Sequence, residues 1–273
     1  MPTTQVYTWD QFVNAYQAQQ GTQADPYVIE IMADLDVASS ITGPYYADVN
    51  GTRYKRINGN YHNISNIATQ TTFNNAIFTG SHVTWDKCNF VNVYRNNPYP
   101  IFFGASDNAP TFNDCTIQGQ GICICGQGNM SANYTGRGIF NRCVLTWRQV
   151  GTSYTGACFG SASFDYCYLD ITIGTSAVGN YDISTVAHSY IKGSITGDTT
   201  GRRTSMISSC SDTVINIDTD LNYTLVNTPG MLSVYNTDRL TGNIVGTTNM
   251  IGVTDAQLKD AAYLASIGFN IIV

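Results

Sequence analysis

The sequence predicts an all-β chain that folds as a right-handed parallel β-helix, a solenoid in which each coil stacks on the previous one. Three observations predict this fold: a degenerate repeat of about 21–28 residues, a composition rich in strand and turn formers, and end segments typical of capping helices. We expect one domain over 1–273, with an N-terminal cap and first strands over 1–56, rungs over 57–250 and a C-terminal cap over 251–273.

The repeat has the pattern apolar, Asn or Asp, any residue, Cys, any residue, apolar. Its copies are residues 85–90, 112–117, 140–145, 164–169 and, in degenerate form, 186–191. The cysteine positions are Cys88, Cys115, Cys143, Cys167 and the equivalent Ser189, with spacings of 27, 28, 24 and 22 residues. Cys210 lies 21 residues further on and is a candidate marker of another rung. Self-similarity of this period is typical of solenoids.

A second short apolar segment, closed by glycine, precedes each copy. These segments are residues 77–80, 101–104, 123–126 and 157–160. Each rung is therefore expected to have at least two strands with a glycine turn between them, and neighbouring coils should lie about 4.8 Å apart.

The spacing within the repeat predicts a bend. Cys and the apolar residue two positions later share a face of the strand and should point inward. The aromatic residue three positions before Cys would point outward in one straight strand, because successive side chains alternate between the two faces. The Asn or Asp between them is expected to take a left-handed bend conformation and to hydrogen-bond from rung to rung; these residues are Asp86, Asn113, Asn141 and Asp165. The residue just before Cys should point outward, which gives an exposed column of Lys87, Asp114, Arg142, Tyr166 and His188.

Both ends carry helix signals. Thr8 and Gln11 form a predicted capping box, and they are followed by apolar residues at helical spacing. Thr254 and Gln257 form a second predicted box, with Gly268 as the expected helix stop. Such helices are expected to cover the end rungs, because an uncovered end rung is an exposed sheet edge.

The composition excludes several classes of function. Only 12% of the residues are charged, the net charge is −6 and basic runs are missing, so nucleic-acid binding is not expected. No apolar stretch approaches the roughly 18 residues needed to span a bilayer, so membrane insertion is not expected. The start of the chain lacks the regions of a secretory signal, which favours synthesis in a cytoplasm.

The eight cysteines are expected to be structural thiols. Four of them recur at one position of the repeat, where a small buried hydrophobic residue fits better than a set of disulfides. Cys123 and Cys125 lack the spacing of a zinc knuckle, so we expect no metal site and no cofactor.

The rungs resemble those of right-handed parallel β-helix proteins of the pectate-lyase-like superfamily. Residues 8–31, 57–60 and 64–67 resemble the opening of such helices in bacteriophage and bacterial-surface proteins, and residues 253–269 resemble a tail seen in phage-encoded proteins of this type. The resemblance implies a bacteriophage virion protein of the tailspike-like type.

The resemblance also implies an alternative activity, polysaccharide cleavage by two acidic residues. Because Glu30 is the only glutamate, the candidate pairs are Asp165 with Asp170 and Asp107 with Asp114. Both pairs are weak candidates, since Asp165 suits the bend and Asp114 the outward column. Lyases of this fold class use a calcium-binding acidic cluster beside a basic residue, and no dense cluster accompanies the arginines of this chain.

Aromatic and arginine residues in the loops are the candidate binding residues. Tyr94-Arg95 and Trp147-Arg148 fall at similar points of their rungs, two rungs apart, and could form a surface for sugars or a protein partner. The remaining candidates are Tyr99, Tyr134, Arg137 and Tyr154. The alternative is that these aromatic side chains only pack the loops onto the solenoid.

These observations favour a non-enzymatic virion component, a capsid- or tail-associated module that presents loops for attachment or for binding a receptor or glycan. Its expected partners are other virion proteins, a host surface glycan and further copies of itself in a homotrimer. The alternatives are a polysaccharide depolymerase of the tailspike type and an adhesin on the bacterial cell surface.

Overall fold

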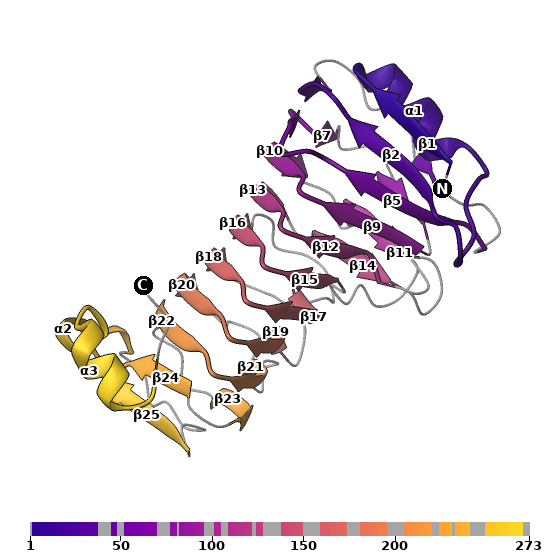
Figure 1. Ribbon diagram of the computed structural model, residues 1–273. Helices are drawn as coiled ribbons and strands as arrows, with labels where there is room; N and C mark the ends of the chain where they lie inside the picture. The colour runs from indigo at the N-terminus through magenta and orange to yellow at the C-terminus, as the bar shows by residue number, and fades with distance from the viewer. Residues whose placement is uncertain are drawn as a thin grey trace.

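The computed structural model of the chain is a parallel β-helix with short helices at both ends (Figure 1). This confirms the predicted fold class. The structure describes residues 2–37, 45–47, 52–69, 77–80, 82–95, 101–104, 109–121, 124–127, 138–149, 159–173, 181–195, 205–219, 224–230, 233–240 and 249–269. No helix in these ranges is long and apolar enough to cross a membrane.

Sheet A is the first of two long parallel sheets and has ten strands within the described ranges. In spatial order they are β1 (Thr3–Val6), β2 (Tyr27–Ile31), β5 (Tyr54–Asn58), β9 (His82–Asp86), β12 (Thr111–Asn113), β15 (Ile139–Asn141), β17 (Phe159–Asp165), β19 (Tyr181–Ala187), β21 (Ser205–Ser211) and β23 (Thr224–Pro229).

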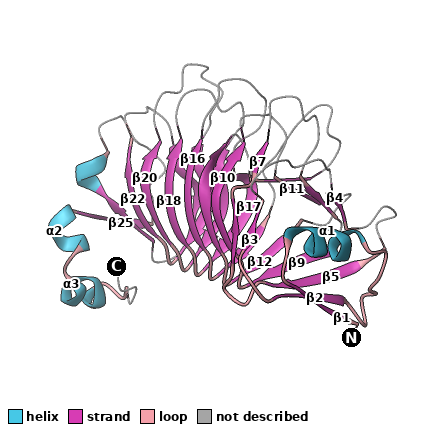
Figure 2. Ribbon diagram, turned by 90° about the horizontal axis from the view of Figure 1, so that it is seen from above, coloured by secondary structure: helices cyan, strands magenta, loops and turns pink. Residues whose placement is uncertain are grey.

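Sheet B is the second long sheet, and its strands follow those of sheet A in each coil. They are β3 (Leu35–Asp36), β6 (Asn63–Ser65), β7 (Ala68–Thr69), β10 (Asn89–Arg95), β13 (Thr116–Gly121), β16 (Val144–Gln149), β18 (Tyr168–Ile173), β20 (Tyr190–Ile195), β22 (Val214–Asp218), β24 (Ser233–Asn236) and β25 (Met250–Val253). Figure 2 shows the strands stacked between helix α1 (Trp9–Gln17) at one end and helices α2 (Asp255–Leu258) and α3 (Ala261–Ser266) at the other.

A short sheet C completes the early coils. Its strands are β4 (Tyr45–Tyr46), β8 (Phe78–Thr79), β11 (Phe102–Gly104) and β14 (Cys125–Gln127). Three of the predicted glycine-closed segments belong to it, but the fourth does not. Phe159 instead begins strand β17 of sheet A, because it pairs with Ile183 of β19.

The bend between sheets A and B lies one residue later than predicted. Asp86, Asn113 and Asn141 end their sheet A strands and keep the strand conformation. The left-handed residue is the next one, with φ of 53° at Lys87, Asp114, Arg142 and Tyr166, and 46° at His188 and Asp212. The prediction that the Asn or Asp takes the left-handed conformation was therefore wrong. One left-handed residue directly after the strand is enough to turn both the aromatic residue and the cysteine inward.

The predicted hydrogen bonds between stacked Asn side chains are confirmed. Asn113 Nδ2 donates to Asp86 Oδ1 at 2.8 Å, and Asn141 Nδ2 donates to Asn113 Oδ1 at 2.8 Å. Each amide thus links its rung to the preceding one just before the bend. Because the donor and acceptor repeat in register, the contact holds successive bends in line.

The residues after the bend form a column that we call the corner ladder: Cys88, Cys115, Cys143, Cys167, Ser189 and Thr213. The Sγ of Cys167 accepts the N–H of Cys143 at 3.4 Å, and the Oγ of Ser189 accepts the N–H of Cys167 at 2.9 Å. Each thiol also donates to the carbonyl two residues earlier, as Cys143 does to Asn141 at 3.3 Å. The ladder therefore supplies acceptors for the N–H groups of Cys143 and Cys167 at the bend.

The described cysteines are all free thiols, and all are buried. Cys210 does not take the ladder position, which corrects its prediction as a rung marker. It pairs with Val186 of β19, at the position that holds an aromatic residue in earlier rungs, and Thr213 takes the ladder position instead.

The core inside the coils contains a stack of aromatic rings contributed by successive sheet A strands. Ring centroids are 6.5 Å apart from Trp85 to Phe112, 5.0 Å from Phe112 to Phe140 and 4.8 Å from Phe140 to Phe164, all nearly parallel. Each of these four side chains is almost fully buried. The aromatic residue that opens each copy of the repeat thus points into the interior, as the predicted bend before the cysteine requires.

Helix α1 (Trp9–Gln17) covers the N-terminal end of this core, as expected. Phe12 and Tyr16 are buried, and the Tyr16 ring stacks on Trp85 at 5.9 Å. Thr8 caps the helix by accepting the N–H of Gln11, but the Gln11 side chain reaches the N–H of Tyr7 and not that of Thr8. The predicted reciprocal capping box is therefore only half formed.

The predicted C-terminal capping box and glycine stop are confirmed, but the segment between them forms two short helices. The capping box of Thr254 and Gln257 is present and begins α2 (Asp255–Leu258), while α3 (Ala261–Ser266) ends before Gly268, whose φ is 86°. The apolar residues of this segment form a second small core with outward-facing residues of sheet B; its members are Tyr190, Val214, Val234, Val253, Leu258, Leu264 and Phe269. The helices thus cover the flank of the last rungs.

Candidate functional site

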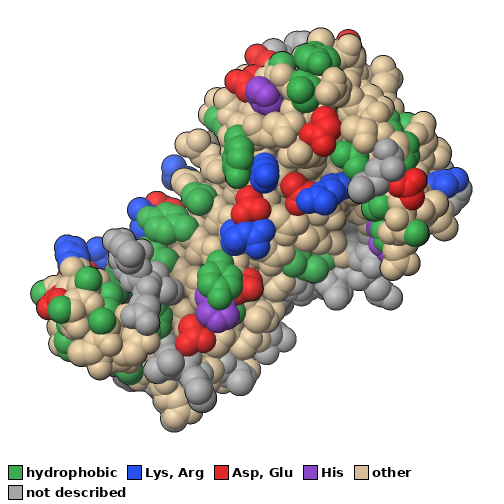
Figure 3. Space-filling model, viewed as in Figure 1, with side chains coloured by type: hydrophobic (Ala, Val, Ile, Leu, Met, Phe, Trp, Pro, Cys, Tyr) green, Lys and Arg blue, Asp and Glu red, His purple; other side chains and the backbone are tan. Residues whose placement is uncertain are grey.

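The residues at the left-handed bend form the expected outward column, which crosses one face as a row of alternating side-chain types (Figure 3). The Lys87 ammonium lies 5.8 Å from the centre of the Tyr61 ring. Arg142 makes two hydrogen bonds with Asp114, at 2.7 and 2.9 Å. These contacts link neighbouring rungs at the outer corner.

The column continues into an aromatic and acidic section. The Tyr166 and His188 rings are parallel, with centroids 4.5 Å apart. His188 Nδ1 lies 2.8 Å from an oxygen of Asp165, and Nε2 lies 3.6 Å from an oxygen of Asp212. The imidazole is therefore fixed by one ring face and two carboxylates.

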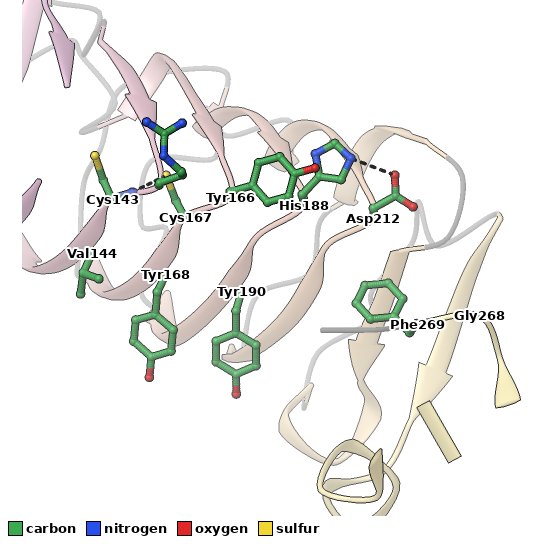
Figure 4. A pocket seen from close by; sticks show the side chains of 11 residues that line it. Cys143, Val144, Tyr166, Cys167, Tyr168, His188, Tyr190, Asp212, Gly268 and Phe269 are labelled. Carbon is green, nitrogen blue, oxygen red and sulfur yellow. Dashed lines mark hydrogen bonds and ion pairs between the residues drawn. The ribbon is translucent and has the colours of Figure 1, made fainter. Parts of the chain in front are cut away.

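A groove of about 540 Å³ opens beside this section, and we call it the corner groove. Six of the side chains that line it carry the argument: Arg142, Tyr166, Tyr168, His188, Tyr190 and Phe269. Figure 4 shows Tyr168 and Tyr190 projecting in the same direction from neighbouring strands, with Phe269 of the C-terminal segment nearby. The groove thus combines the solenoid corner with the segment that follows α3.

The repeat explains why the tyrosines lie on this face. Tyr166 precedes Cys167 at the bend and Tyr168 follows it at the start of β18, so both side chains point outward while Cys167 points inward. Tyr166 is 61% exposed and Tyr168 is 37% exposed. Tyr168 stacks on Tyr190 of the next rung at 5.4 Å, so its ring is held in place while part of it stays exposed.

Ion pairs surround the tyrosines. Arg142 lowers the pKa of the Asp114 carboxyl through its hydrogen bonds, so this group stays ionised at neutral pH. Lys192 lies 3.0 Å from Asp170 and 5.4 Å from the centre of the Tyr168 ring. Hydrogen bonds with Tyr168 and Asp170 raise the pKa of Lys192, which keeps its ammonium charged.

The described candidate catalytic aspartates are thus engaged by other side chains. Asp114 forms an ion pair with Arg142 and Asp170 with Lys192, while Asp165 lies 2.8 Å from Nδ1 of His188. Asp107 lies outside the described residues. The described part also has no group of three or more His, Cys, Asp or Glu that could hold a metal ion. An ionised carboxylate held by a cation is a poor general acid, as the lowered pKa of Asp114 illustrates.

Two of the predicted binding residues lie on one face of sheet B. Tyr94 of β10 pairs with Gln120 of β13, and Gln120 pairs with Arg148 of β16, so Tyr94 and Arg148 are aligned two rungs apart. Both side chains are exposed. This alignment is the one expected for a binding surface, although Arg148 and not Trp147 is the partner of Tyr94.

Trp147 is buried, with 1% of its surface exposed, which contradicts the prediction that it forms part of a binding surface. The cause is the regular alternation of strand β16, in which Leu145 and Trp147 share the inner side with Cys143. Tyr94 is different, because β10 has an irregularity between Phe90 and Val93, where Asn92 has a φ of 54°. The extra residue moves Tyr94 outward, and such a bulge has no clear sequence signal.

The other predicted binding residues cannot be placed in the same way. The backbone of Arg95 ends strand β10, but its side chain lies outside the description. Tyr99, Tyr134, Arg137 and Tyr154 lie outside the described residues.

Sequence reasoning missed the tyrosines and Phe269 of the corner groove. A signal was present for Tyr166 and His188, which already stood in the predicted outward column. Tyr168 and Tyr190 also occupy matching positions, directly after ladder residues. Phe269 carried no such signal, because it reaches the groove only through the fold of the C-terminal segment.

Comparison with known proteins supports the fold and one class of function. Residues 3–124 match the model of a family described as a pectate lyase-like adhesive domain. The match covers less than half of the chain, and the corner groove lies entirely beyond it. No curated protein and no solved structure gives a significant match.

The predicted likeness to pectate-lyase-like β-helices is confirmed by this family match together with the fold. An adhesive domain on a β-helix fits an adhesin or another surface-binding module. The bacteriophage origin stays a prediction.

Proposed function

We propose that the chain is a non-catalytic, surface-binding module of the adhesin type, and that its corner groove binds a glycan. The observation that carries this proposal is the pair of outward tyrosines, Tyr166 and Tyr168, beside a rim of charged side chains. Aromatic faces stack on the apolar faces of sugar rings, and a few placed polar groups fix the orientation of a ligand. Arg142, His188 and Asp212 are the polar groups available here.

The groove is also organised before any ligand binds. Tyr166 is stacked on His188, and Tyr168 is stacked on Tyr190 with Lys192 over its ring. Side chains that are already held lose little conformational freedom on binding, so more of the contact energy contributes to affinity. This favours a binding role for the two exposed rings over a role in packing alone.

The depolymerase alternative has less support. Cleavage of a glycosidic bond needs one carboxyl group that can donate a proton and one that can act as base or nucleophile. Asp114 and Asp170 are paired with cations and Asp165 contacts the imidazole of His188, and the lowered pKa of Asp114 opposes proton donation at neutral pH.

The setting of the module is a further proposal. The family match favours a bacterial cell surface. The resemblance of the end segments favours a virion, where other virion proteins and two further copies of the chain would be the partners.

Replacing Tyr166 by Ala is expected to weaken glycan binding about tenfold, because a ring stacked on a sugar contributes on the order of 1 kcal/mol beyond its buried area. The measurement is binding of the whole chain to an array of immobilised neutral, uronate-bearing and sulfated oligosaccharides, followed by titration of the strongest binder. Tyr61→Ala is the matched control, since Tyr61 is also exposed and also has a positive φ.

Equal losses in the Tyr166 and Tyr61 variants would speak against the corner groove as the site. An array on which the unaltered protein binds no oligosaccharide would refute glycan binding altogether.

A further inference from the structure

A second groove of about 380 Å³ lies on the outer face of sheet B, and we call it the sheet groove. The side chains that matter here are Tyr94, Gln118, Gln120, Thr146, Arg148 and Asp170. They come from four consecutive strands, β10, β13, β16 and β18. The glycan proposal above does not use this groove.

Arg148 is the distinctive residue of the sheet groove. It is exposed and forms no ion pair with any described residue. Two other cations near this sheet whose side chains are described are already paired, Lys192 with Asp170 at 3.0 Å and Arg239 with Asp218 at 3.1 Å. The carboxylate of Asp170, which lines the groove together with Arg148, is therefore already paired with Lys192. The guanidinium of Arg148 lines the groove and pairs with no described carboxylate.

The neighbours of Arg148 suit an oligosaccharide. Gln120 lies between Tyr94 and Arg148 in the register of the sheet, so an exposed ring, an amide and a guanidinium follow one another across the strands. The ends of this row are two strands apart, which corresponds to about 10 Å. Amides, guanidinium groups and tyrosine rings together can bind hydroxyl groups, an acidic group and a sugar face.

The two grooves are neighbours on strands β16 and β18. On β16, Val144 lines the corner groove while Thr146 and Arg148 line the sheet groove. On β18, Tyr168 lines the corner groove and Asp170 the sheet groove. These side chains all project from the outer face at alternate positions, so the two grooves follow one another along the strands, with Tyr168 in the first and Arg148 in the second.

We infer that the sheet groove is a second subsite for the same glycan, and that Arg148 binds a carboxylate or sulfate of a linear, anionic oligosaccharide lying along both grooves. This inference rests on the proposed function and adds the charge and the extended form of the ligand. A guanidinium binds either group through two parallel hydrogen bonds, which makes it more selective than a point charge.

The test uses the full chain on an array that contains chondroitin 6-sulfate, desulfated chondroitin and carboxyl-reduced, desulfated chondroitin of equal length, together with other neutral, uronate-bearing and sulfated oligosaccharides. We expect the bound set to be acidic, and each acidic binder to exceed its neutral counterpart about tenfold or more in affinity. Arg148→Gln should abolish this advantage and leave the affinity for the neutral counterpart unchanged. If desulfated chondroitin keeps the advantage over its neutral counterpart, the carboxylate is recognised, and if desulfation removes the advantage, the sulfate is recognised.

Lys259→Gln serves as the control, because it removes one exposed positive charge outside both grooves. Thermal unfolding checks that both variants are folded. The inference is overturned if neutral and acidic counterparts bind equally, if Arg148→Gln binds like the unaltered chain, or if it loses neutral and acidic binders alike. Those results leave glycan binding in place, whereas an array without any binder overturns both proposals.

Discussion

Phe112→Ala is expected to lower the free energy of unfolding by about 3–5 kcal/mol, the usual cost of removing a buried aromatic ring. Phe112 is fully buried and lies in the middle of the aromatic stack, with Phe140 at 5.0 Å on one side and Trp85 at 6.5 Å on the other. Its ring also meets Phe102 edge-on at 5.0 Å. The strands of neighbouring rungs hold the backbone in register, so the cavity cannot close easily.

Urea denaturation followed by circular dichroism measures this change. Phe112→Leu is the matched variant, since it keeps an apolar side chain and most of the volume, and it should cost clearly less. A loss below about 1 kcal/mol in the Ala variant would mean that the stack does not support the coils.

The corner ladder predicts a large loss of stability at alkaline pH. Burial raises the pKa of the Cys115 thiol, a hydrogen bond with Cys115 raises that of Cys143 to about 12, and a hydrogen bond with Cys143 raises that of Cys167. The folded state therefore favours the neutral thiols, whereas the unfolded chain ionises near its ordinary thiol pKa. The stabilisation is complete below that ordinary pKa and is lost as the pH rises above it.

For three such thiols the expected loss is about 4 kcal/mol between pH 8 and pH 10. The measurement is the free energy of unfolding in urea over this pH range. Ser replacements at Cys115, Cys143 and Cys167 should flatten the dependence, because a hydroxyl does not titrate there and Ser189 already occupies the same ladder position. A profile that stays as steep in the Ser variant would assign the loss to other groups.

Much of the fold follows from the repeat. The cysteine spacing identifies the coils because one residue type returns to one structural position, where only a small side chain with a hydrogen-bonding atom fits. The alternation of side chains along each strand then separates inward from outward residues, and it correctly places Phe112 inside and Arg142 outside.

The errors have local physical causes. Asn and Asp favour the left-handed region in general, but here their side chains link the rungs and the next residue makes the bend, even where it is Tyr166 or Arg142. Inter-rung contacts, such as the ion pair of Arg142 with Asp114, support this uncommon conformation. Side chains from other rungs supply those contacts, so the sequence around one bend does not reveal them.

The candidate site was predictable only in part. Arg148 faces outward, and Trp147 inward, by simple alternation after Cys143 in the regular strand β16. Tyr94 faces outward only because one extra residue in β10 changes the alternation, which the sequence does not reveal. The corner groove needed the C-terminal segment, whose Phe269 packs with Tyr190 across a long sequence separation. Contacts of this kind depend on the whole fold.

A crystal structure of the protein with the oligosaccharide that binds best on the array tests the central claim most directly. The account predicts sugar rings stacked on Tyr166 and Tyr168 in the corner groove, with the chain continuing toward Arg148. An oligosaccharide bound on another face, with both tyrosines left free, would contradict it.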